Sequence, residues 1–212
     1  IIIEGGTWVE MDTNIPSGES LIRQFQFGKR FIKEEFGVES RIFWLPDSFG
    51  VSAAMPQIMK GCKIDYFANA KVRWLYNDGD VIPHSLFLWK GIDGSGILST
   101  ILIGYECPML PENLINRWSM QPEKEEVPIQ LIAFGYGDGG GGTTRTQLEY
   151  IAREEDLEGM PKVVQKSPNE FFEYVEKECN LNSTFVGELY FAAHRGTYTS
   201  QAKTKRGNRK CE

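Results

Sequence analysis

The sequence has 212 residues, of which 41% are hydrophobic and 25% are charged, and its formal net charge at pH 7 is −6. A chain of this length can bury a sizeable core, and its composition is ordinary for a globular protein. The negative net charge argues against nucleic acid or an anionic membrane as the main partner and fits a neutral polar ligand.

Two features bear on the compartment and on the extent of the chain. Four cysteines are widely scattered and form no C-x-x-C pair: Cys62, Cys107, Cys179 and Cys211. This spacing argues against a thiolate zinc site and a disulfide framework, so we expect reduced thiols in the cytoplasm. No apolar run approaches the length of a membrane span. The chain begins with Ile1-Ile2-Ile3 and ends with the helix-like basic run KTKRGNRKCE. We therefore expect it to be part of a longer polypeptide.

Two helices have clear boundaries in the sequence. Apolar residues recur roughly at helical spacing between Ser17 and Phe36, and Gly37 is placed to end this helix. The stretch Ser167-Pro168-Asn169-Glu170 predicts the start of another helix. It offers a hydroxyl cap, a proline at the first helical position and a glutamate at the third. We expect this helix to run to about Glu178.

Shorter helical and strand-like stretches alternate through the rest of the chain. The other expected helices cover residues 52–60, 112–118 and 146–155. The expected strands cover residues 7–10, 41–45, 64–68, 128–134, 162–165 and 185–191. The stretch HSLFLWKGIDGSGILSTILI predicts two further strands, joined as a hairpin through Asp93-Gly94-Ser95-Gly96. This alternation predicts one α/β domain with a mostly parallel sheet and flanking helices.

Two acidic residues follow expected strands. Asp47 lies in FWLPDSFG, and Asp138 lies in the glycine-rich FGYGDGGGG. Loops at the strand ends of parallel α/β folds converge from several directions, so carboxylates placed there can meet. Such a pair suggests glycoside hydrolysis, in which one carboxylate attacks or supports the anomeric carbon and the other transfers a proton. Spacing alone favours a helix cap for Asp47 and a turn residue for Asp138.

The glycine run has a second interpretation. Backbone N–H groups in such a loop can bind phosphate, and Gly135, Gly137 and Gly140 have the spacing G-x-G-x-x-G. However, the run lacks the lysine and hydroxyl pair of a P-loop and has no acidic partner downstream. A phosphate or nucleotide binder is therefore the weaker alternative.

A further segment, from Glu188 to Ser200, places His194 and Arg195 after another expected strand. Because His84 is the only other histidine, this segment alone cannot build a His-rich metal site. A lone histidine is more often a hydrogen-bonded structural residue than a metal ligand.

Together, these motifs match a known family. The chain resembles the catalytic domain of the α-mannosidases of glycoside hydrolase family 38, most closely the bacterial enzymes and the fungal vacuolar enzyme. The resemblance is carried, in the expected order, by GGTWVEMDTNIPSGESLIRQF, FWLPDSFGVSAAMPQI, CKIDYFANAK, LFLWKGIDGSGILS, FGYGDGGGG and ELYFAAHRGTYTSQAKTKRGNRK. It implies that residues 1–212 form a single, incomplete domain of a seven-stranded (β/α) barrel-like fold. The first barrel strand and the C-terminal domains would be missing.

The resemblance also implies a zinc ion and retaining hydrolysis of terminal α-linked mannose through a covalent glycosyl-aspartate. The implied substrate is an α-mannoside or a mannose-containing oligosaccharide. Asp47 matches the family's nucleophile and zinc ligand, and Asp138 matches the segment that supplies the general acid/base. A retaining pair predicts carboxyl groups about 5–5.5 Å apart. The candidate substrate contacts lie in segments typical of the family: Asp12, Lys71, His194, Arg195 and Tyr198.

The sequence departs from the family pattern at the metal. The family's early His-x-Asp motif and later His-rich motif are both absent, since Ser85-Leu86 follows His84 and Arg195-Gly196 follows His194. Only Asp47 remains of the four expected ligands, so we expect this chain by itself to bind zinc weakly and turn over little or nothing. A barrel that lacks its first strand has unpaired strand edges, which favour association of this chain into a homo-oligomer. A sugar-binding module without catalysis is the other alternative.

Overall fold

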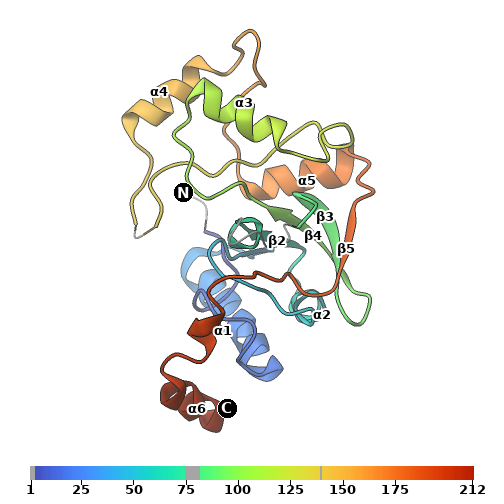
Figure 1. Cartoon of the computed structure of the whole chain (residues 1–212), viewed down its shortest axis with the longest axis vertical. Coiled ribbons are helices and arrows are strands. Elements are labelled where there is room, and N and C mark those ends of the chain that lie inside the picture. Colours follow the sequence, from blue (N-terminus) through green and yellow to red (C-terminus); the bar gives the residue numbers. More distant parts are fainter. Residues whose placement is uncertain (1–2, 75–81, 139) are drawn as a thin grey trace.

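The computed structural model describes residues 3–74, 82–138 and 140–212. It contains one five-stranded sheet with the strand order β1-β2-β4-β3-β5 (Figure 1). The strands are β1 (Ile42–Trp44), β2 (Tyr66–Asn69), β3 (Leu86–Lys90), β4 (Gly96–Ile101) and β5 (Thr184–Val186). The pairs β1–β2, β2–β4 and β3–β5 are parallel, and the β3–β4 hairpin is antiparallel. The α/β class with a mostly parallel sheet is therefore confirmed.

Helices cover both faces of the sheet (Figure 1). They are α1 (Gly18–Phe36), α2 (Met55–Gly61), α3 (Pro111–Ser119), α4 (Arg145–Arg153), α5 (Pro168–Glu178) and α6 (Ala202–Cys211), with the 3₁₀ helices η1 (Lys71–Arg73) and η2 (Arg195–Tyr198). Phe43 of β1 packs with residues of α1 and α2 in the larger core cluster, whereas its neighbour Ile42 packs with residues of α5 in the second. The alternation of side chains along β1 therefore separates two cores.

The helix boundaries predicted from local signals are confirmed. The Ser17 side chain accepts a hydrogen bond from the Ser20 N–H, and Gly37 ends α1 with φ of 69°. At α5, Ser167 and Glu170 form a complete capping box. Such caps each contribute about 1 kcal/mol because they satisfy N–H groups that lack helical partners.

Three expected strands are not strands. Residues 7–10 lie on α1 instead, where the Trp8 N–H donates to the Gln24 carbonyl and the backbone of Thr7 crosses Gly28 so closely that an added Cβ would lie 2.2 Å from it. Residues 128–134 are irregular: the Gln121 side-chain amide donates to the Ile129 carbonyl at 2.9 Å, and their apolar side chains pack, partly buried, against both the sheet and the helices. Residues 162–165 are also irregular and largely exposed.

The strand expected over 185–191 is shorter than predicted. β5 ends at Val186, and Gly187 follows with φ of 109°, a backbone conformation that favours glycine. Leu189 then pairs with Val51 as an isolated antiparallel bridge. Within the described residues the sheet is open, with β1 and β5 at its edges, and the seven-stranded barrel stays a prediction.

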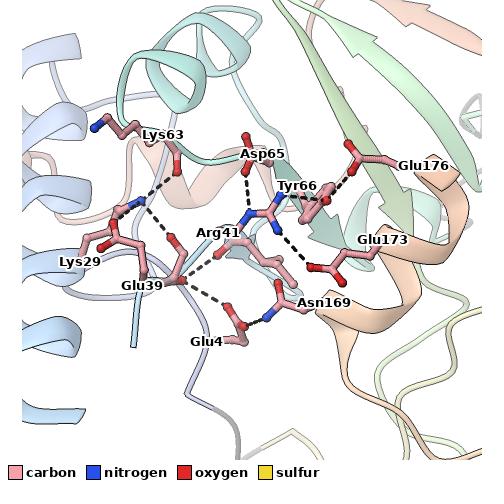
Figure 2. Close-up of polar contacts among 12 residues, drawn as sticks. Glu4, Lys29, Glu39, Arg41, Lys63, Asp65, Tyr66, Asn169, Glu173 and Glu176 are labelled. Carbon is pink, nitrogen blue, oxygen red and sulfur yellow. Dashed lines mark hydrogen bonds and ion pairs between the residues drawn. The ribbon is translucent and has the colours of Figure 1, made fainter. Parts of the chain in front are cut away.

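A polar network at the N-terminal ends of β1 and β2 joins α5 to the sheet (Figure 2). The Arg41 guanidinium lies 2.8 Å from Asp65, 3.1 Å from Glu173 and 3.1 Å from the Tyr66 hydroxyl. The same hydroxyl donates to Glu176 at 2.6 Å, and burial, followed by Glu176, raises the pKa of Tyr66. Asp47 and Lys71 follow the opposite, C-terminal ends of these two strands.

None of the helices that the structure describes is long and apolar enough to cross a membrane. All four cysteines are free thiols, and Cys107 is buried.

Candidate active site

Two neighbouring strand ends bring Asp47 and Lys71 together. Asp47 follows β1, and Lys71 opens η1 directly after β2. The Lys71 ammonium lies 2.9 Å from Oδ1 of Asp47. The backbone fixes this approach, since the N–H groups of Ala70 and Lys71 both donate to the Pro46 carbonyl at 3.0 Å. The Lys71 side chain is only 10% exposed, whereas that of Asp47 is 48% exposed. The carboxylate is therefore held from the protein side and accessible from solvent.

Two aromatic rings complete the surroundings of this carboxylate. The Tyr105 hydroxyl donates to Oδ1 of Asp47 at 3.2 Å. The ring of Trp74 stacks on Tyr105, with centroids 6.0 Å apart and planes at 26°. The Lys71 ammonium lies 3.8 Å from the centroid of the Trp74 ring, a cation–π contact. Lys71 and Tyr105 are thus fixed against each other through Trp74 while both contact Asp47.

The electrostatics of Tyr105 link both predicted carboxylates. Burial raises the pKa of Tyr105 to about 12, with smaller contributions from the charge and hydrogen bond of Asp47 and from the charge of Asp138. The phenol therefore stays protonated, and able to donate to Asp47, throughout the neutral range.

Asp138 approaches this group on the glycine-rich loop. Its own φ is 43°, and its side chain is exposed. The preceding Gly137 crosses Tyr105 and Glu106 so closely that an added Cβ would lie 2.9 Å from a side-chain carbon of each. A glycine is thus required where the loop passes Tyr105. The separation of the two carboxyl groups expected for a retaining pair stays a prediction.

An open pocket of about 410 Å³ lies in front of Asp47. Asp12 and Tyr198, two of the predicted contacts, line it together with Asp47. The Tyr198 hydroxyl donates to the Phe49 carbonyl at 3.1 Å and accepts from the Asn14 side chain at 2.7 Å. Burial raises the pKa of Tyr198, and the charge of Asp12 adds to this effect. Tyr198 therefore remains a neutral hydroxyl at the pocket wall.

His194 and Arg195 lie behind this wall and do not line the pocket. The His194 ring packs edge-on against Phe49, with centroids 5.2 Å apart. The Arg195 side chain donates to the Phe191 carbonyl at 2.8 Å, and its guanidinium lies 3.8 Å from the centroid of the Tyr190 ring. Both residues thus contact aromatic rings next to the pocket wall.

Sequence reasoning missed Tyr105, Trp74 and Glu10. Glu10 accepts a hydrogen bond from the Asp47 N–H at 3.3 Å and also lines the pocket. Tyr105 follows the C-terminal end of β4, which pairs in parallel with β2. The rule that chemistry gathers at strand ends would have included Tyr105 if the strand order had been known.

The described residues do not form a zinc site by themselves. Within residues 3–74, 82–138 and 140–212, no three His, Cys, Asp or Glu side chains come together as a group that could hold a metal ion. Asp47 is a suitable oxygen donor, but its Oδ1 contacts Lys71 and Tyr105. A structural or catalytic zinc needs at least three protein ligands.

The loop geometry disfavours the phosphate-binding alternative. Irregular backbone, rather than a strand, precedes the glycine run. At the start of α4, the Gln147 N–H is already bonded to the Thr144 side chain, and the Gln147 side chain accepts from the Thr144 N–H. This capping box occupies the helix end that a phosphate would use.

The comparisons with known proteins agree on one family. The sequence model described as "Glycosyl hydrolases family 38 N-terminal domain" matches residues 1–197. The chain is 44% identical over 210 residues to "Alpha-mannosidase G" of Dictyostelium discoideum, covering 98% of this chain and 19% of that protein. It is 43% identical over 210 residues to "Alpha-mannosidase 2C1" of Homo sapiens, covering 98% and 20%. For "Alpha-mannosidase" of Saccharomyces cerevisiae the identity is 44% over 213 residues, covering 95% and 20%.

The chain thus spans about one fifth of the length of these curated relatives. Among solved structures, "an alpha-mannosidase from Enterococcus faecalis V583" superimposes with a TM-score of 0.64 at 18% identity, covering 87% of this chain and 22% of that one. This similarity shows a shared fold.

Proposed function

The chain belongs to glycosyl hydrolase family 38, and we propose that it supplies the catalytic carboxylates of an enzyme that hydrolyses terminal α-linked mannose with retention. The observation that carries the proposal is the position of Asp47. This carboxylate follows β1, is held by Lys71 and Tyr105, and faces an open pocket. The similar proteins of three organisms are named α-mannosidases, which supports the substrate class.

In the first step Asp47 attacks the anomeric carbon. Lys71 and Tyr105 both contact Oδ1, so we assign the attack to Oδ2. A bond forms between Oδ2 and carbon one while the glycosidic carbon–oxygen bond breaks. Asp138 donates its proton to the departing oxygen. The products of this step are the free aglycone alcohol and a glycosyl ester on Asp47.

In the second step water replaces the ester. Asp138 removes a proton from the water, whose oxygen bonds to carbon one as the bond to Oδ2 breaks. Mannose leaves with its original anomeric configuration, and both carboxyl groups return to their starting states. The Lys71 ammonium and the Tyr105 hydroxyl stabilise the charge that reappears on Asp47.

The pocket in front of Asp47 fits the sugar. Its volume of about 410 Å³ lies within the usual range for small-molecule sites. Asp12 and the neutral hydroxyl of Tyr198 offer a hydrogen-bond acceptor and a second polar group beside Asp47. We assign both to the hydroxyl groups of the mannose ring.

Zinc remains part of the proposal with a limited role for this chain. A zinc ion would hold and polarise sugar hydroxyls, and Asp47 would contribute one ligand. The other ligands would come from segments outside the described residues, so we expect the chain alone to turn over little mannoside. The free thiols of all four cysteines fit a reducing compartment, which we propose is the cytoplasm.

The test compares Asp47→Asn with Asp93→Asn in the full polypeptide that the gene encodes, supplied with zinc. Asp93 is an exposed turn residue between β3 and β4 and serves as the matched control. We expect hydrolysis of an aryl α-mannoside by the wild type and by Asp93→Asn, α-mannose as the first product by NMR, and loss of activity in Asp47→Asn. Activity in Asp47→Asn, or β-mannose as the first product, would refute the mechanism. Binding of mannosides without hydrolysis by the wild type would favour a sugar-binding module.

A further inference from the structure

One fully buried amide joins the two loops that carry Asp47 and Lys71. Asn69 is the last residue of β2 and is 0% exposed. Its side-chain N–H₂ group donates to the Leu45 carbonyl at 2.6 Å and to the Ser48 carbonyl at 2.9 Å. Its side-chain oxygen accepts from the Val72 N–H at 3.0 Å. Three hydrogen bonds therefore leave one side chain and end on backbone groups of two different loops.

The positions of these backbone groups are informative. Leu45 and Ser48 lie on either side of Asp47, two residues before it and one after it. Val72 directly follows Lys71 in η1. Through these bonds Asn69 contacts neither charged side chain. It binds instead the backbone next to each of them. A shift of the Asn69 amide would therefore move the Asp47 carboxylate and the Lys71 ammonium relative to each other.

Strand pairing alone does not explain this arrangement. The β1–β2 ladder ends with the Leu45 N–H bonded to the Ala68 carbonyl, and the Pro46 carbonyl anchors the start of η1. Ser48 lies beyond both anchors. On the far side of the Asp47 turn, Asn69 therefore adds a bond to the Ser48 carbonyl, beside the bond from the Ser48 hydroxyl to the Met11 carbonyl. Because the Asn69 amide is fully buried, leaving it unpaired would be costly.

We propose that Asn69 is a positioning residue that sets the geometry of the Asp47–Lys71 pair. The inference rests on the proposed function, because Asp47 is taken to be the nucleophile. Asn69 acts through the backbone and does not touch the substrate. A misplacement of about 1 Å in a reacting group can cost roughly 10²-fold in rate, so such a residue should affect kcat more than KM.

The chain offers a matched control in Gln121. This amide is 3% exposed, and its side-chain N–H₂ group also donates to two backbone carbonyls, those of Val127 and Ile129, both at 2.9 Å. Asn69→Leu and Gln121→Leu each remove two hydrogen bonds from an amide N–H₂ group to backbone carbonyls, and Asn69→Leu also removes the bond from the Val72 N–H. Only Asn69→Leu does so beside Asp47, so a comparison of the two variants separates positioning from a general loss of stability.

The test measures how readily the Lys71 amine is acetylated, by mass spectrometry of the chain after brief treatment with an acetylating reagent. Lys29 is the internal reference, because its side chain is 12% exposed and its ammonium is bonded to the carbonyls of Ser40 and Lys63. If Asn69 positions Lys71, acetylation of Lys71 relative to Lys29 rises several-fold in Asn69→Leu and stays unchanged in Gln121→Leu. Asn69→Ser, whose hydroxyl cannot reach all three backbone groups, replaces Asn69→Leu if that variant does not fold.

An unchanged ratio in the Asn69 variant, or an equal rise in Gln121→Leu, would overturn the proposal. This readout needs no turnover, so it decides the positioning role even if the protein proves not to be a mannosidase. In the full polypeptide, the role further requires that kcat falls in Asn69→Leu while KM changes little and that Gln121→Leu retains the wild-type kcat. A loss confined to KM would also contradict it.

Discussion

The Tyr105 hydroxyl lies 3.2 Å from Oδ1 of Asp47, the same oxygen that Lys71 approaches to 2.9 Å. One oxygen of the carboxylate is thus engaged by a neutral donor and a cation, which come from the segments after β4 and β2. This arrangement orients the carboxylate. We assign its second oxygen, Oδ2, to the reaction with the substrate. It also explains why Tyr105 must keep its proton, which its pKa of about 12 ensures.

We expect Tyr105→Phe to lower kcat by roughly 10- to 100-fold. The variant keeps the ring that stacks on Trp74 and removes only the hydrogen bond to Asp47. Hydrogen bonds to charged groups are worth about 1.5–3 kcal/mol, which sets this range. Tyr136→Phe is the control, because Tyr136 is 66% exposed on the neighbouring loop. Equal rates for the two variants in an aryl α-mannoside assay would show that the Tyr105 hydroxyl does not contribute to catalysis.

Two glycines of the loop should respond differently to alanine. At Gly137 an added Cβ would lie 2.9 Å from side-chain carbons of Tyr105 and Glu106, whereas at Gly142 it would meet no atom within 4 Å. We expect Gly137→Ala to displace Asp138 and to lower kcat by roughly tenfold or more, with Gly142→Ala close to the wild type. Thermal unfolding should show both variants folded. If both retain full activity, the position of Asp138 beside Tyr105 is not needed for catalysis.

Two carboxyl groups in the network of Figure 2 should give opposite pH effects on stability. Burial raises the pKa of Glu4, although Asn169 and Ser40 donate hydrogen bonds to it. A carboxyl group with a raised folded-state pKa stabilises the fold at low pH, and this contribution is lost as the pH rises through the folded-state pKa. Glu4→Gln should therefore raise the Tm at about pH 8 and change it little at about pH 4.

Glu39 provides the comparison with the reverse sign. The hydrogen bond from Lys33, followed by the charge of Lys29, lowers the pKa of Glu39. Its contribution is present above the unfolded-state pKa and is lost as the pH falls through the folded-state pKa. Glu39→Gln should therefore lower the Tm at about pH 8, by a small amount because the pair is exposed. Shifts of the same sign in both variants would contradict these assignments.

The chain of 212 residues by itself should bind zinc weakly. The described residues offer no group of three potential ligands around Asp47, and zinc sites use at least three. After equilibrium dialysis against zinc, we expect metal analysis to find well below one equivalent, with no difference between the wild type and Asp47→Asn. One retained equivalent that Asp47→Asn abolishes would show that the chain completes a zinc site.

Local chemistry made part of this fold predictable. Ser17 and Gly37 bound α1, and the Ser167–Glu170 capping box starts α5, because these signals act within a few residues. The apolar run over 128–134 misled because its apolar side chains pack, partly buried, against the core clusters, while its backbone belongs to no strand. A short apolar run does not by itself distinguish a strand from an irregular segment that packs on a core.

The candidate site was also predictable only in part. The rule for strand ends found Asp47, which follows β1, whereas Lys71 was named only because its segment resembles the family. The same rule reached Asp138 through a strand over 128–134 that the structure does not contain. Tyr105 and Trp74 escaped because their contact depends on β4 pairing with β2, an order that the sequence does not display. Asn69 escaped for a related reason, since a buried asparagine at a strand end reveals its role only through its three backbone partners.

The most direct measurement of the central claim is covalent trapping of the nucleophile. The full polypeptide that the gene encodes, shown to be folded and loaded with zinc, is incubated with a fluorinated α-mannosyl fluoride and then digested for mass spectrometry. We predict a sugar adduct on the peptide that carries Asp47, and none in Asp47→Asn. No adduct, or an adduct on a different carboxylate, would contradict the assignment of Asp47 as the nucleophile of a retaining α-mannosidase.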